Sequence, residues 1–198
     1  MRTAAIIAGG EGRRLGGLDK SDLIIDGQRV LERQLGVVGQ VAEHILIVSN
    51  DHHRFRASGV RVCTDLISGT GPLGGVYTAL VRSPTTRTLV IAGDLPFLTA
   101  RFLRYLTDYA DAVGAVVPWS SHGPQPLCAV YDRSCCEPIH ARLERRALRL
   151  SDFAETPSVA RLSAAKVTPF DPDGRLFFNV NTPDDHTRAC RLARMTRA

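Results

Sequence analysis

The sequence contains no run of 18 apolar residues and no signal-peptide pattern, because a strand-like segment begins almost at its first residue. We therefore expect a cytoplasmic protein without a membrane partner. Hydrophobic residues make up 44% of the chain and charged residues 23%, which excludes a disordered or fibrous class. A chain of 198 residues can bury about 70% of its unfolded surface, so we expect a single domain over residues 1–198.

Cysteine pairs of the CxxC type are also missing, and the five cysteines are odd in number. Disulfide frameworks and structural zinc sites need paired cysteines, so we expect reduced thiols. Cys135, Cys136 and His140 lie close together in the sequence but lack the second ligand pair of a zinc site.

Lysine is nearly absent, since only Lys20 and Lys166 occur among the 25 basic residues. The net charge of +5 would suit a polyanion, but many arginines fall in two segments with helical spacing, which is typical of a solvated helix face. These arginines are Arg142, Arg145, Arg146, Arg149, Arg188, Arg191, Arg194 and Arg197. No nucleic-acid-binding motif accompanies them, so we expect no nucleic-acid partner.

Short apolar runs alternate with helix-length stretches in the first half of the chain. We expect strands at residues 3–8, 44–48, 60–63, 88–92 and 112–117, and helices at 30–41, 74–82 and 99–109. This alternation predicts right-handed βαβ crossovers and an α/β fold with a mostly parallel sheet. After residue 118 we expect strands at 126–131, 167–170 and 177–180, and helices at 133–150 and 183–195, with no linker before them.

Ligands of open α/β sheets bind beyond the carboxyl ends of the strands. The first such end carries AGGEGRRLGGLDK, residues 8–20, which fails the GxGxxG pattern at Leu15 and the Walker pattern because Leu18 and Asp19 precede Lys20. Its glycines still allow backbone amides to converge on an anion, and its basic residues Arg13, Arg14 and Lys20 add charge. The alternative is a surface loop whose arginines only aid solubility.

Other strand ends supply further candidates. Asp94 in TLVIAGDLPFL can hold Mg²⁺, although a turn aspartate ahead of Pro96 would look the same. GTGPLGG, residues 69–75, can let a flat base lie against the backbone or can be a tight connection. In NVNTP, Asn179 and Asn181 point the same way if the segment is extended.

In this order, AGGEGRRLGGLDK, GTGPLGG, AGDLPF and NVNTPDD resemble the molybdenum cofactor guanylyltransferases over residues 4–185. The resemblance implies a Rossmann-like, three-layer α/β/α nucleotidyltransferase fold. It also implies transfer of GMP from GTP to molybdenum-bearing molybdopterin with release of pyrophosphate, Mg²⁺ as the cofactor, and transient contacts with molybdenum-insertion and acceptor proteins. Residues 1–118 would form the nucleotide-binding half and residues 119–198 the acceptor half.

Site roles follow from this resemblance residue by residue. The expected nucleotide contacts are Ile7, Ala8, Gly9, Gly10, Gly12, Lys20, Asn50, Asp65, Gly71, Pro72, Leu73 and Asp94. Asp94 would also hold the metal, and Arg13, Arg14, Lys20 and Asp94 would be catalytic. The expected pterin-side contacts are Gln125, Pro126, Asn179 and Asn181.

Three local departures and several alternatives accompany the resemblance. Position 7 carries Ile where Leu is commoner, GPQPL at 123–127 matches only loosely, and Asp22 would weaken the positive field near Lys20. A CTP-using or sugar-phosphate relative remains an alternative, but Gly9 favours GTP because cytidylyl relatives tend to carry alanine there. A non-catalytic GTP-binding protein of cofactor delivery is a second alternative, against which Lys20 and Asp94 both argue.

Overall fold

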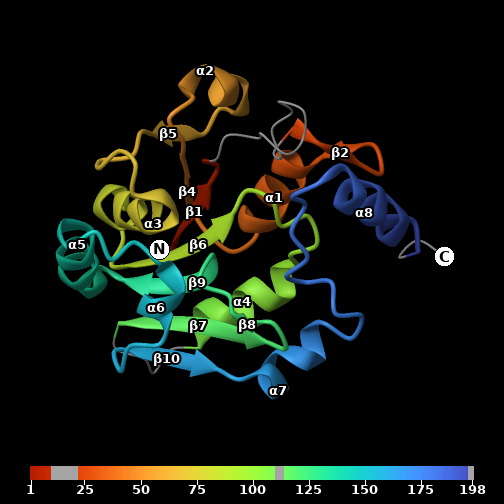
Figure 1. Cartoon of the computed structure of the whole chain (residues 1–198). Helices are drawn as coiled ribbons and strands as arrows, with labels where there is room; N and C mark the ends of the chain where they lie inside the picture. Colours follow the sequence, from red (N-terminus) through yellow and green to blue (C-terminus); the bar gives the residue numbers. More distant parts are fainter. Residues whose placement is uncertain (10–21, 110–113, 196–198) are drawn as a thin grey trace.

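The computed structural model describes residues 1–9, 22–109 and 114–195 and is built around an eight-stranded sheet (Figure 1). The strands run in the order β10-β7-β9-β6-β1-β4-β5, and the short β8 pairs with β7. Their bounds are β1 Thr3–Ile7, β4 His44–Val48, β5 Arg61–Cys63, β6 Arg87–Ala92, β7 Ala115–Ser120, β8 Gly123–Pro124, β9 Cys128–Asp132 and β10 Val159–Leu162. Among these described strands, β9 and β8 pair antiparallel to their neighbours and the other pairings are parallel.

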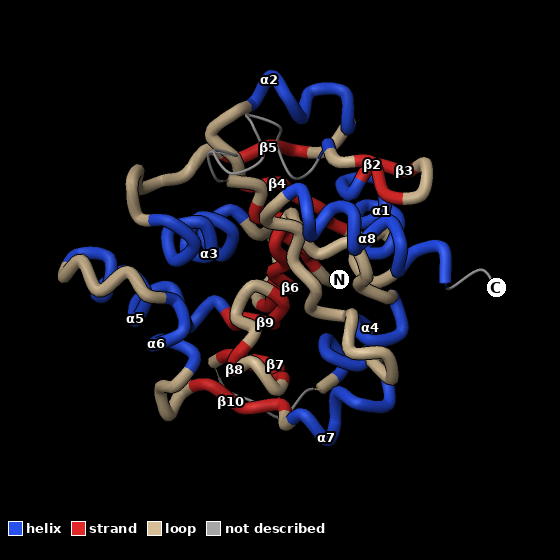
Figure 2. Tube along the Cα trace, turned by 45° about the vertical axis from the view of Figure 1, so that its right-hand side comes forward, coloured by secondary structure: helices blue, strands red, loops and turns tan. Residues whose placement is uncertain are grey.

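Helices cover both faces of this sheet (Figure 2). One face packs against α1 (Val30–Val38), α4 (Ala100–Asp108) and α7 (Ala164–Val167), and the other against α3 (Gly71–Arg82), α5 (Cys136–Glu144) and α6 (Leu150–Ala154). Side chains alternate between the two cores, as Ala4 and Ile6 of β1 face the first and Ala5 faces the second. The three-layer α/β/α fold with a mostly parallel sheet is therefore confirmed.

A smaller core joins a hairpin to the last helix. The hairpin consists of β2 (Ile24–Ile25) and β3 (Gln28–Arg29), and α8 (Pro183–Met195) packs beside it (Figure 1). Leu23, Ile25, Val180 and Ala189 are buried between them. This contact brings the C-terminal part of the chain next to the segment that follows the glycine-rich loop.

Several expected elements are confirmed. The strand at 44–48 and the helix at 183–195 have the expected bounds, and Thr99 caps α4 by accepting a hydrogen bond from the Phe102 N–H (3.2 Å). Helix α3 begins at Gly71 rather than at residue 74, because Pro72 is tolerated in a first helical turn. The strand expected at 112–117 runs instead from Ala115 to Ser120, and residues 110–113 lie outside the described part.

The helix expected at 133–150 is confirmed only over α5, Cys136–Glu144, and the strands expected at 167–170 and 177–180 are wrong. The first of these segments forms a 3-10 turn at Arg133–Cys135 and then α5, which ends at Glu144, and Arg146 adopts a positive φ of 59° before α6 begins. The segment at 167–170 ends α7 in a 3-10 turn, and residues 177–180 form no strand. The parallel edge strand on this side is β10, which sequence reasoning missed.

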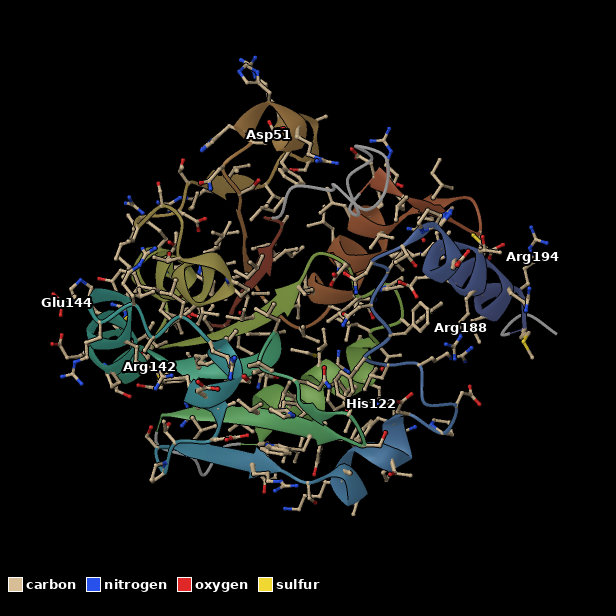
Figure 3. The ribbon with its side chains drawn as sticks, viewed as in Figure 1. Asp51, His122, Arg142, Glu144, Arg188 and Arg194 are labelled. Carbon is tan, nitrogen blue, oxygen red and sulfur yellow. The ribbon has the colours of Figure 1, made fainter. Side chains whose placement is uncertain are left out.

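The arginines of α8 and the cysteines are placed as the sequence predicts. Arg188 and Arg194 point outward from α8 (Figure 3), as expected of a solvated helix face. All five cysteines are free thiols, and burial raises the pKa of Cys135 to about 11. Within the described ranges, no helix is both long and apolar enough to cross a membrane.

Candidate active site

A cleft of about 1050 Å³ opens at the carboxyl ends of β1, β4 and β6. Most of the predicted site residues line this cleft, although they come from widely separated segments of the chain. Those that line it are Ile7, Ala8, Gly9, Asn50, Asp65, Gly71, Pro72, Asp94, Gln125, Pro126, Asn179 and Asn181. The nucleotide-side and pterin-side candidates therefore share one cleft.

Six predicted site residues are not among the described residues that line this cleft. Leu73 does not line the cleft: its side chain is fully buried in the core between α3 and the sheet, which leaves only its backbone for a ligand. Gly10, Gly12, Arg13, Arg14 and Lys20 lie outside the described residues. Sequence reasoning missed Leu127 and Leu150, which line the cleft as ordinary apolar residues and carry no signal of their own.

Asp94 sits in a turn where β6 passes close to the end of β1. The Gly93 N–H donates to the Ile7 carbonyl oxygen (2.9 Å), and a Cβ at position 93 would lie only 3.2 Å from that oxygen. Glycine therefore permits this approach. The turn brings the half-buried Asp94 to the same cleft wall as Ile7 and Ala8.

The NVNTP segment is tied to this turn. The Val180 N–H donates to the Asp94 carbonyl oxygen (3.1 Å), so Asn179 and Asn181 flank the Asp94 turn at the cleft. Thr182 caps α8, since its hydroxyl accepts from the Asp185 N–H (3.1 Å). The Asp185 carboxylate in turn accepts from the Asn181 and Thr182 amides at 3.0 and 2.9 Å, which fixes the backbone of the segment.

Asn50 and Asp65 form a reciprocal pair between the ends of β4 and β5. Asn50 Nδ2 donates to Asp65 Oδ2 (3.2 Å), and the Asp65 N–H donates to Asn50 Oδ1 (3.1 Å). Partial burial raises the pKa of Asp65, and the hydrogen bond from Asn50 opposes this effect. Asp65 Oδ1 has no hydrogen-bond partner among the described residues, so hydrogen bonds offset only part of the desolvation cost of this carboxylate.

The first turn of α3 forms another wall of the cleft. The Thr70 hydroxyl donates to the Ile67 carbonyl (2.6 Å) instead of capping the helix, and the first turn contains no acidic residue. The uncapped amides near Gly71 are therefore suited to an anionic or polar ligand edge. A Cβ at Gly75 would lie 2.9 Å from Ile7 Cγ2, so glycine lets this helix approach β1.

Asp22 has a cationic partner. Its Oδ2 accepts from Arg54 Nη2 (2.6 Å), and Arg54 belongs to α2 (His52–Phe55), which begins after Asp51 at the top of the molecule (Figure 3). Burial lowers the pKa of Arg54. The ion pair offsets the negative charge that Asp22 would otherwise add near the end of the glycine-rich loop.

The donor set of the cleft fits a hard cation. Asp94 offers carboxylate oxygens, and the amides of Gln125, Asn179 and Asn181 line the same space. Over the described ranges, no three His, Cys, Asp or Glu side chains group as a metal cluster. Mg²⁺ is usually held by one or two carboxylates together with substrate phosphates, an arrangement in which Asp94 could serve as the carboxylate ligand.

The strand order and the position of the cleft place this protein among the α/β enzymes that bind a nucleotide at the carboxyl edge of a parallel sheet. Residues 4–158 match the family described as MobA-like NTP transferase domain. The chain belongs to this family and is a nucleotidyltransferase.

Named relatives and solved structures agree with this family. A protein named "Probable molybdenum cofactor guanylyltransferase" from Pelotomaculum thermopropionicum is 32% identical over 98% of this chain and 95% of its own length. The structure of molybdopterin-guanine dinucleotide biosynthesis protein A from Archaeoglobus fulgidus is 26% identical, with a TM-score of 0.82 over 98% of this chain and 99% of that one. A Mycobacterium tuberculosis protein solved in complex with manganese shares the fold, with 18% identity and a TM-score of 0.66 over 96% and 99% of the two chains.

Proposed function

We propose that this protein transfers GMP from GTP to the terminal phosphate of molybdenum-bearing molybdopterin, forming molybdopterin guanine dinucleotide and pyrophosphate. The observation that carries this proposal is the continuous cleft of about 1050 Å³ that joins Asp94 to Asn179 and Asn181. Pockets for small ligands usually measure about 300–1,000 Å³, so this cleft is large, and its lining includes both the nucleotide-side and the pterin-side residues. The names of the relatives, a molybdenum cofactor guanylyltransferase and a molybdopterin-guanine dinucleotide biosynthesis protein, support this choice of substrates.

In this proposal the two halves of the chain bind different substrates. Residues 1–118 bind the nucleotide through Ile7, Ala8 and Gly9, through the Asn50–Asp65 pair and through the first turn of α3. Residues 119–198 bind the acceptor through Gln125, Pro126, Asn179 and Asn181, which line the other part of the cleft. Transient contacts with molybdenum-insertion and acceptor proteins are part of the same proposal.

The reaction needs no side-chain nucleophile. An oxygen of the acceptor phosphate, already ionised near neutral pH, forms a bond to the α-phosphorus of GTP while the bond to the β-phosphate oxygen breaks and pyrophosphate leaves. Catalysis is then mainly placement and charge neutralisation. Arg13, Arg14, Lys20 and the loop amides would stabilise the departing pyrophosphate, although they lie outside the described residues.

Asp94 is the residue proposed to hold Mg²⁺. The cation would supply positive charge at the reacting phosphate, and the Asp94 turn would hold its carboxylate in place through the hydrogen bonds from Gly93 and Val180 to their partners. The manganese in the Mycobacterium tuberculosis structure supports a divalent cation in this fold.

A comparison of GTP with CTP tests the proposal. Purified protein supplied with molybdenum-bearing molybdopterin and Mg²⁺ is expected to release pyrophosphate from GTP in clear preference to CTP. Equal or faster turnover of CTP would favour the cytidylyltransferase alternative. GTP binding without pyrophosphate release would favour a delivery protein.

Asp65→Asn is expected to change thermal stability and GTP binding in opposite directions. The pKa of Asp65 is higher in the folded protein than in the unfolded chain, where it is about 4. The free energy of unfolding therefore falls as the pH rises above about 4, because Asp65 ionises more readily in the unfolded chain. We expect Asp65→Asn to weaken GTP binding by calorimetry but to gain melting temperature relative to the unsubstituted protein as the pH rises from 4 to 7. A stability loss that grows over the same pH range would contradict this expectation.

A further inference from the structure

The side chain of Gln34 bridges the backbone on the two sides of the turn that carries Asp94. Gln34 lies on α1 and is 1% exposed. Its Nε2 donates to the Ala92 carbonyl (2.6 Å) and to the Leu95 carbonyl (3.2 Å). Both partners are carbonyl oxygens, so only the NH₂ group can face them. One side-chain amide therefore joins the two ends of the turn that contains Asp94.

Gln34 is a polar exception on the face of α1 that packs inward. The buried residues of this helix are Val30, Gln34 and Val38, which follow each other at intervals of four. An apolar side chain at position 34 would complete this stripe. Gln34 Oε1 is buried and has no hydrogen-bond partner among the described residues. Burying this amide therefore costs free energy of desolvation, which an apolar side chain at the same position would not.

We infer that Gln34 is a positioning residue for Asp94, and this inference rests on the proposed role of Asp94 as the metal-binding carboxylate. Gln34 holds the backbone on both sides of the turn, so the Asp94 carboxylate meets the cation in a fixed place. The Val180 N–H contacts the Asp94 carbonyl from the acceptor side of the cleft. The turn is thus held between α1 and the NVNTP segment.

Gln34→Met tests this inference because it keeps a similar volume and removes the donor. Loss of a residue that orients a metal ligand typically lowers metal affinity or activity about 10- to 100-fold. We expect Mn²⁺, followed by electron paramagnetic resonance with GTP present and acceptor absent, to bind at least about tenfold more weakly. The metal concentration for half-maximal pyrophosphate release should rise in parallel, while the KM for GTP at saturating metal changes little. Gln34→Asn, whose amide is one methylene shorter, is the second variant and should weaken Mn²⁺ binding in the same direction.

Thr3→Val is the matched control for the loss of one buried hydrogen bond. Thr3 is 1% exposed, and its Oγ1 accepts from the Thr85 hydroxyl (2.8 Å) at the amino end of β1, the end away from the cleft. This control should lower the melting temperature without changing Mn²⁺ affinity.

The outcomes separate this inference from the proposed function. If Asp94→Asn weakens Mn²⁺ binding but Gln34→Met behaves like Thr3→Val, the positioning role is overturned and the proposed function stands. If Mn²⁺ binding is unchanged in Asp94→Asn as well, the metal-binding role of Asp94 and the positioning role of Gln34 are both overturned, while GMP transfer is tested separately by pyrophosphate release from GTP. Weaker binding in Asp94→Asn, Gln34→Met and Gln34→Asn, with Thr3→Val unchanged, supports both.

Discussion

Asp94→Asn is expected to fold normally and to lose metal-dependent pyrophosphate release by about 10²–10³-fold, the usual effect of removing one preorganised electrostatic group. The substitution keeps the size of the side chain and removes its negative charge. The backbone contact should survive, because Val180 donates to the carbonyl of residue 94 rather than to its side chain. Turnover is measured by pyrophosphate release over a Mg²⁺ titration, and folding by thermal unfolding.

Glu144→Gln is the matched control for this change of charge. Glu144 is an exposed carboxylate on the outer side of α5 (Figure 3), outside the cleft lining. Its loss should leave turnover unchanged. Near-normal activity in Asp94→Asn would remove Asp94 from the mechanism.

Gly114→Ala is expected to cause the largest loss of stability. Gly114 has a φ of +100°, and a Cβ there would lie 2.2 Å from the Ser158 carbonyl oxygen. Its own carbonyl accepts from the Asp132 N–H (2.6 Å), so the residue lies where β7, β9 and the start of β10 meet. Backbone strain of about 1–2 kcal/mol and a steric cost of about 1–3 kcal/mol together predict a loss of about 3 kcal/mol. At roughly 2–4 °C per kcal/mol, the melting temperature should fall by about 10 °C.

Gly123→Ala separates the two contributions. Gly123 has nearly the same φ, +103°, but a Cβ there would meet no described atom within 4 Å. It should therefore lose only the backbone contribution. Equal losses in the two variants would show that the contact with Ser158 is unimportant.

The alternating apolar runs predicted the sheet well because buried parallel strands are short, continuous and bounded by turns. The second half was harder to predict because tertiary contacts determine it. Arg146 adopts a positive φ in a segment that reads as one basic helix, and no local residue preference signals that break. At 177–180 the Val180 N–H bonds to Asp94 rather than to a neighbouring strand.

The candidate site was predictable where the chemistry lies at strand ends. Asn179 and Asn181 reach the cleft although the strand expected there is wrong, since their role depends on the tie to Asp94. The burial of the Leu73 side chain was not predictable, because a motif gives no information about which way a helical side chain faces. Gln34 carried no signal, because a glutamine in an amphipathic helix reads as a surface residue.

The antiparallel strand β9 constrains how this protein can be re-engineered. It lies between β6, which precedes residue 118, and β7, which spans that residue, so the two halves of the chain are interleaved in one sheet. A chain cut at residue 118 would divide β7 and leave the edge of β6 that pairs with β9 without a partner. A foreign C-terminal half therefore cannot be grafted as a block, and chimaeras must keep β9 matched to the strands on either side.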